Sequence, residues 1–175
     1  MYKLLVSVLL LFSSTLVNSA VALRPHSKDI EVAHSNYGWM SEVKGNVLGV
    51  YIDNVTSSFI SEAELQNYIT LRLRNLAREL SYTTGEPSPN KNWLTFEVEL
   101  YKFNDTSQIY YGLISLNYAP ARAYQKRGVP EYQITIAFAE GARSLKTSLK
   151  KDLDNILETF ASDYYRIADY KPQKR

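Results

Sequence analysis

The side chains that could carry out chemistry are few in this chain. Glu97 and Glu99 lie two residues apart in WLTFEVELYKF, so on a strand they share one face and could form a carboxylate pair. Acid–base work by such a pair needs surroundings that separate the two pKa values. An open sheet face beside tyrosines does not obviously supply them, so we interpret both glutamates as solvated or structural.

Other catalytic signatures are absent from the sequence. There is no cysteine, and the only histidines, His26 and His34, precede the patterned part of the chain. No nucleophile elbow, Walker loop, dinucleotide fingerprint or histidine pair with metal-ligand spacing occurs. We therefore predict no catalytic, cofactor-binding or metal-binding residues.

Tyrosines and basic residues offer binding chemistry instead. The chain has 14 tyrosines, a residue enriched at interfaces because it combines an apolar ring with a polar tip. The proline-bounded loop 119–130 adds Arg122, Lys126 and Arg127, which could hold an anionic group or could simply form a solvated turn. A formal net charge of only +2 argues against bulk capture of nucleic acid or an anionic membrane.

The first 22 residues are typical of a secretory signal peptide. Lys3 precedes an apolar run from Leu4 to Phe12, and Ala20-Val21-Ala22 has the small-x-small form of a cleavage site. The run is shorter than the roughly 20 residues of a membrane-spanning helix. We expect cleavage after Ala22, no transmembrane segment afterwards, and a periplasmic location, with full secretion as the alternative.

Residues 45–170 are patterned as a single α+β domain. Alternating apolar residues predict strands over 45–55, 93–103, 108–118 and 131–141. Apolar stripes with helical spacing predict helices that begin after Ser61 and near Leu145, with a capping box at Ser61 and Glu64 and with Ser144 as the N-cap of the second helix. Two such helices can cover one face of a four-stranded, mainly antiparallel sheet, which gives a two-layer sandwich. Residues 23–44 are expected to be a polar, mobile or loosely docked arm, and 171–175 a polar tail.

The strand over 108–118 has apolar residues on both of its faces. If Leu100 lies opposite Gly112, then Ile114 and Leu116 join the helix-covered face, whereas a slip of one residue exchanges the two faces. Either the tyrosines left outside reflect strand propensity alone, or they form a partner surface. On the second interpretation, the candidate partner-binding residues of the outer face and the basic loop are Tyr51, Glu97, Glu99, Tyr101, Tyr111, Leu113, Arg122, Lys126 and Arg127.

The succession VYIDNV, ISEAELQNYITLRLRNLAREL and WLTFEVELYKF behind a signal peptide resembles small exported bacterial envelope proteins of unknown function. In fold it is similar to periplasmic envelope-assembly modules such as the lipopolysaccharide-assembly lipoprotein. The resemblance covers about residues 45–170 and rests on pattern. Those lipoproteins carry a lipidated N-terminal cysteine, which this chain lacks.

Three hypotheses for function follow. The first is a non-catalytic, exported interaction or envelope-assembly module that uses the open sheet face or a strand edge to bind an envelope protein or a second copy of itself. The second is a carrier that holds an amphiphilic ligand between helices and sheet, which a deep apolar cavity would favour. The third is a hydrolytic enzyme, which a cluster of titratable groups in a cleft would favour.

Overall fold

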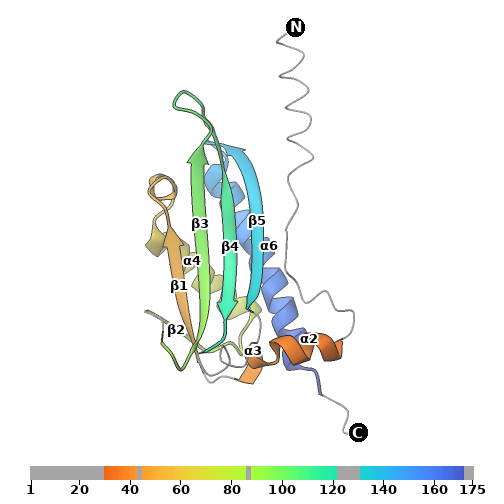
Figure 1. Cartoon of the computed structure of the whole chain (residues 1–175). Coiled ribbons are helices and arrows are strands. Elements are labelled where there is room, and N and C mark those ends of the chain that lie inside the picture. The colour runs from red at the N-terminus through yellow and green to blue at the C-terminus, as the bar shows by residue number, and fades with distance from the viewer. Residues whose placement is uncertain (1–29, 43–44, 86–87, 122–130, 172–175) are drawn as a thin grey trace.

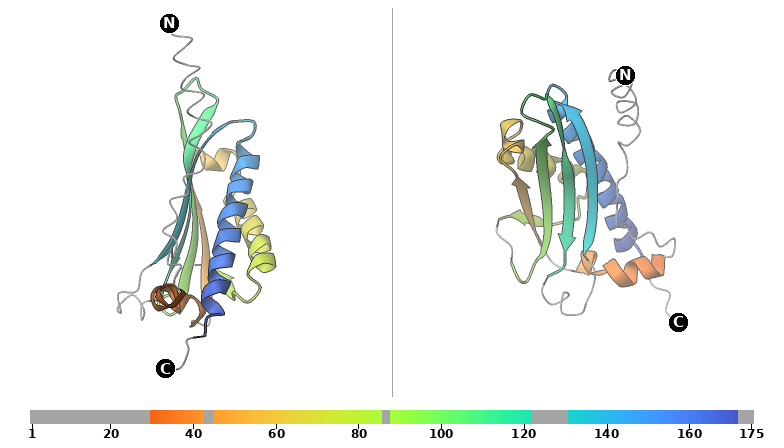
Figure 2. Two further views of the ribbon diagram at one scale, coloured as in Figure 1. Left: turned by 90° about the vertical axis from the view of Figure 1, so that its right-hand side faces the viewer. Right: turned by 45° about the horizontal axis from the view of Figure 1, so that its top comes forward.

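Five strands form one open sheet, and two long helices pack on one of its faces (Figure 1 and Figure 2). The computed structural model describes residues 30–42, 45–85, 88–121 and 131–171. In chain order, the strands are β1 (Asn46–Ile52), β2 (Tyr82–Thr84), β3 (Asn92–Lys102), β4 (Ile109–Ala119) and β5 (Tyr132–Gly141). The helices are α2 (Ile30–Tyr37), α3 (Trp39–Glu42), α4 (Glu62–Leu76) and α6 (Leu145–Ala168), with a short 3-10 turn, η1 (Thr56–Ser58). The predicted two-layer α+β arrangement is confirmed.

The sheet has one more strand than predicted, and its pairing is mixed. The spatial order is β2-β1-β3-β4-β5, in which β1 runs parallel to both β2 and β3 and the pairs β3–β4 and β4–β5 are antiparallel. The parallel pairs arise because α4 carries the chain across one face between β1 and the next strands. The expected four strands become five because β2, with only three residues, is too short to show an alternating pattern.

The long helices bury the stripes that the sequence predicts. Leu65, Ile69 and Leu73 of α4 are buried. The same holds for the stripe of α6, which comprises Leu145, Leu149, Leu153, Ile156, Leu157, Phe160, Tyr164 and Ile167. Together with the inner face of the sheet they form one hydrophobic core.

The two predicted helix caps differ in detail from the structure. Ser61 Oγ accepts a hydrogen bond from the Glu64 N–H at 3.1 Å, so this half of the capping box is confirmed. The Glu64 carboxylate turns instead toward α6 and binds Lys146 and Lys150. Ser144 makes no side-chain cap; its hydroxyl donates to Glu140 Oε1 at 2.8 Å.

The N-terminal segment is more ordered than we expected. Residues 30–42 form α2 and α3, which pack at one end of the molecule beside α6 (Figure 1). Trp39 and Met40 are buried, and the Trp39 ring lies 4.9 Å from that of Tyr118, centroid to centroid. The expectation of a loosely docked arm is therefore wrong for these residues. Ala33 is buried as well, and the Tyr37 ring packs edge-on against Tyr132, so several side chains dock a segment that is otherwise polar.

The predicted register of the β3–β4 hairpin is confirmed. Leu100 lies opposite Gly112, and Val98 lies opposite Ile114. A β-carbon at Gly112 would lie 2.0 Å from the Glu99 carbonyl oxygen, so the two strands approach here only because residue 112 has no side chain. This register fixes which side chains of β4 face away from the helices.

Candidate interaction surface

The sequence predicts a partner surface on the sheet face that α4 and α6 leave uncovered. In Figure 1 both helices lie behind the sheet, so this face is toward the viewer. Cross-strand partners share a face, so the register places Tyr101, Tyr111 and Ala139 in one row. The neighbouring row holds Glu99, Leu113 and Ala137. The odd-numbered residues of β3, β4 and β5 therefore line this uncovered face.

Exposed apolar side chains are concentrated at one end of this face. The described part of the chain has nine exposed large hydrophobic residues. Five of them lie on the far half of the β3–β4 hairpin, and we call these five the hairpin patch: Tyr101, Phe103, Ile109, Tyr111 and Leu113. Figure 2 shows this end of the hairpin extending past the start of α6. Five of the nine exposed large hydrophobic residues in the described chain thus lie on one protruding element.

The members of the hairpin patch are held in register by the strands beneath them. Phe103 N–H donates to the Ile109 carbonyl at 3.0 Å, so the pairing continues almost to the turn. The Tyr101 and Tyr111 rings stack, with centroids 5.5 Å apart and planes 24° from parallel. Because aromatic pairs on adjacent strands stabilise a sheet, the patch is a preformed surface.

The covered side of the hairpin anchors the patch. The Tyr110 ring packs edge-on against Phe59, with the centroids 4.9 Å apart. Asp53, just after β1, accepts hydrogen bonds from the Leu100 N–H at 3.0 Å and the Thr56 N–H at 2.6 Å. The Asp53 side chain thus hydrogen-bonds to the backbone of β3 just beyond the end of β1.

Two carboxylates border the hairpin patch along β3. The Tyr101 hydroxyl donates to Glu99 Oε2 at 3.1 Å, and this contact raises the pKa of the Tyr101 hydroxyl. Glu97 lies one row further and opposite Tyr51 of β1. The Tyr51 ring leans over Gly49, where an added β-carbon would lie 3.0 Å from it. Tyr51 therefore points away from the hairpin patch, although it shares the uncovered face.

The structure brings together only part of the predicted set. Tyr101, Tyr111, Leu113 and Glu99 are adjacent, with Glu97 bordering them. The predicted basic residues Arg122, Lys126 and Arg127 lie outside the described residues. Phe103 and Ile109 were not among the predicted residues, although both continue the same odd-numbered alternation toward the turn.

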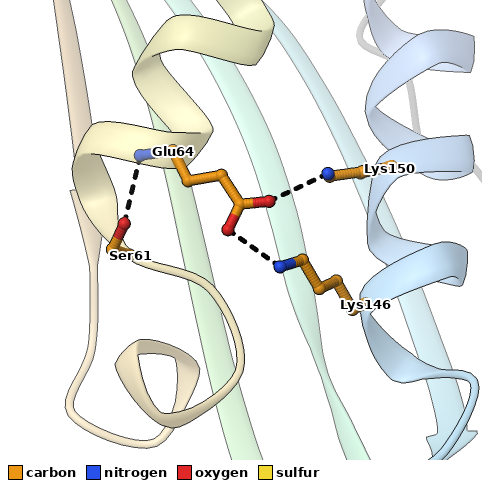
Figure 3. Close-up of polar contacts among 4 residues, drawn as sticks. All are labelled: Ser61, Glu64, Lys146 and Lys150. Atoms are coloured by element: carbon orange, nitrogen blue, oxygen red, sulfur yellow. Dashed lines mark hydrogen bonds and ion pairs between the residues drawn. The ribbon is translucent and has the colours of Figure 1, made fainter.

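On the opposite surface, which α4 and α6 form, charged side chains of the two helices form ion pairs with one another. Glu64 of α4 accepts from Lys146 at 2.8 Å and from Lys150 at 2.9 Å, as Figure 3 shows. Hydrogen bonds from these two lysines hold the pKa of the Glu64 carboxyl below its usual range. Further along the two helices, Arg72 binds Asp154 at 2.7 Å. The charges of this surface thus join α4 to α6.

The described ranges also bear on metal binding and on membrane insertion. They hold no group of three or more histidine, aspartate or glutamate side chains that could bind a metal ion. Within the same ranges, no helix has the length and apolar character needed to cross a membrane.

Comparison with known proteins gives a similarity of fold alone. No protein-family model matches the sequence, and no curated protein matches it. A solved structure of an uncharacterized protein shares 8% identity over 69% of this chain and 98% of that chain, with a TM-score of 0.43. A PelC dodecamer from Paraburkholderia phytofirmans shares 9% identity over 69% of this chain and 85% of that chain, with a TM-score of 0.41. A minor lipoprotein from Acinetobacter baumannii shares 9% identity over 74% of this chain and 99% of that chain, with a TM-score of 0.30.

Proposed function

We propose that this chain is an exported, non-catalytic interaction module of the cell envelope and that the hairpin patch binds another protein. The observation that carries the proposal is the concentration of exposed apolar residues on one ordered hairpin. Exposed hydrophobic residues are ordinary when scattered, but a contiguous group of them is typical of an interaction site.

Strand propensity alone does not explain the hairpin patch. It accounts for half-exposed tyrosines, because tyrosine favours strands and tolerates partial exposure. Phe103, Ile109 and Leu113 have no polar atom to hydrate, yet their exposed fractions are 65%, 47% and 42%. Burial against a partner would give each of them the apolar surroundings that the domain itself does not provide.

The packing between the two layers favours this proposal over a carrier of an amphiphilic ligand. Large side chains from both layers meet there, including Phe96 of β3 and Leu153 and Phe160 of α6, and all three are fully buried. A carrier needs a cavity at such a place, whereas an interaction module needs only an exposed surface.

A crosslinking experiment tests the proposed function. A photoreactive phenylalanine analogue at position 113 should give one discrete crosslinked product in cells. The same analogue at position 71, an exposed leucine on α4, should not give it. In addition, the double substitution Tyr111→Ser and Leu113→Lys should weaken association roughly tenfold or more, because central anchors dominate interface energy. Equal crosslinking at positions 71 and 113, or none at 113, would contradict the proposal.

The exported form of the chain provides a second prediction. Intact-mass measurement should show a mature protein that begins near Leu23, because small residues at positions 20 and 22 suit signal peptidase. A mature protein that keeps all of residues 1–22 and stays in the membrane fraction would contradict the proposed export.

A further inference from the structure

Around the hairpin patch, the described side chains of the uncovered sheet face carry charge of only one sign; the cation Lys91 lies at the opposite end of this face, where its Nζ donates to Thr83 Oγ1 at 3.2 Å. The residues that its strands present there are Val47, Gly49, Tyr51, Thr83, Trp93, Thr95, Glu97, Glu99, Tyr101, Ile109, Tyr111, Leu113, Ser115, Asn117, Ala119, Gln133, Thr135, Ala137, Ala139 and Gly141. Glu97 and Glu99 are the charged members of this set, and both are carboxylates. Lys102 is the nearest cation along β3. It is even-numbered and so does not belong to the uncovered face, and its Nζ donates to the Asp105 carbonyl at 2.6 Å.

These two carboxylates differ from those of the helical layer. Glu64, Asp154 and Glu158 each lie within 3.2 Å of a lysine or arginine nitrogen. No ion pair joins Glu97 or Glu99 to a cation within the part of the chain that the structure describes. Glu64, Asp154 and Glu158 are thus neutralised by cations of the domain, whereas within the described residues no cation neutralises Glu97 or Glu99.

The geometry places these carboxylates where a protein bound at the hairpin patch would meet them. Glu99 lies opposite Leu113, in the row next to the Tyr101–Tyr111 stack. Glu97 follows about 7 Å along the strand, since residues two apart on a strand are separated by twice the rise. The Tyr101 hydroxyl holds Glu99 Oε2, which orients this carboxylate on the face.

We propose that the partner surface that docks on the hairpin patch carries arginine side chains beside apolar ones. This rests on the proposed function and specifies the chemistry of its partner. A guanidinium group can bind a carboxylate through two parallel hydrogen bonds and can also stack on a tyrosine ring. A second copy packed over the same region would bring like charges together, which disfavours self-association through this face.

Short peptides of matched shape test this proposal. The probes are acetyl-Arg-Leu-Arg-Leu-Arg-amide and the same peptide with citrulline, an uncharged isostere, in place of each arginine. Binding to the exported form of the chain is followed by NMR through the methyl groups of Leu113, Ala137 and Ala139. The arginine peptide should bind roughly three- to tenfold more tightly, as expected for exposed charge pairs. This advantage should shrink in 0.5 M salt.

Substitutions of the chain assign that advantage to the two carboxylates. The double variant Glu97→Gln and Glu99→Gln should bind both peptides equally. The matched variant Glu62→Gln and Glu79→Gln, which alters exposed carboxylates outside the sheet, should keep the preference. The proposal is overturned if wild type binds both peptides equally, if the Glu97/Glu99 variant keeps the preference, or if neither peptide shifts the Leu113 methyl resonances. Equal binding of both peptides at Leu113 refutes the arginine preference alone, whereas absent crosslinking at position 113 refutes the proposed function.

Discussion

Replacing Leu153 by alanine should lower the free energy of unfolding by about 2–5 kcal/mol. Leu153 lies in the middle of α6 and is 0% exposed within the core shared by the two layers. Alanine would remove the apolar contacts of the leucine and leave a cavity, because a close-packed core relaxes only partly around a deletion. Chemical denaturation of wild type and variant at one pH measures the loss.

A neighbouring position on the same helix provides the control for this substitution. Lys151 is exposed, so Lys151→Ala should change the free energy of unfolding by no more than about 0.5 kcal/mol. If Leu153→Ala costs as little as Lys151→Ala, the stripe of α6 does not form the core of the domain.

The sequence predicts the layers of this fold because their patterns are long and one-sided. The stripe of α6 extends over more than 20 residues, and the alternation of β3 extends over a whole strand, so each element has a single face that can be buried. The hairpin register follows from the same pattern, because a slip of one residue would expose the apolar residues that pack under the helices. By contrast, β2 is too short to carry a pattern, and its place beside β1 depends on where α4 ends.

Only part of the candidate surface could be predicted, because alternation assigns side chains to a face within a strand but does not show where strand pairing stops. Alternation places Tyr101, Tyr111 and Leu113 on the uncovered face. Phe103 and Ile109 border the turn, where a sequence pattern no longer shows whether strand pairing continues. Tyr51 shares the predicted face, but only the three-dimensional arrangement shows its ring lying over Gly49.

The docking of α2 and α3 depends on a buried polar cluster that joins distant parts of the chain. The Tyr118 hydroxyl hydrogen-bonds to Asn46 Oδ1 and lies 3.3 Å from the Met40 carbonyl oxygen. Asn92 donates to the same hydroxyl at 3.2 Å and accepts from the Ala121 N–H at 2.9 Å. The Tyr118 hydroxyl is protonated at neutral pH, as an ordinary tyrosine is, and burial raises its pKa further, so it is a hydrogen-bond donor. No local pattern reveals this cluster, since each of its hydrogen bonds joins residues that are 26 to 78 positions apart.

Asn92→Ala should therefore lower the free energy of unfolding by about 2–4 kcal/mol. The substitution leaves the buried Ala121 N–H without its acceptor and removes one hydrogen bond from Tyr118. An orphaned buried donor costs more than a lost surface contact, because water cannot replace its partner. Asn117→Ala is the matched control, since Asn117 lies on the uncovered face of β4 and its loss should cost less than about 0.5 kcal/mol. Equal denaturation midpoints for the two variants would show that the polar cluster does not hold the N-terminal helices to the sheet.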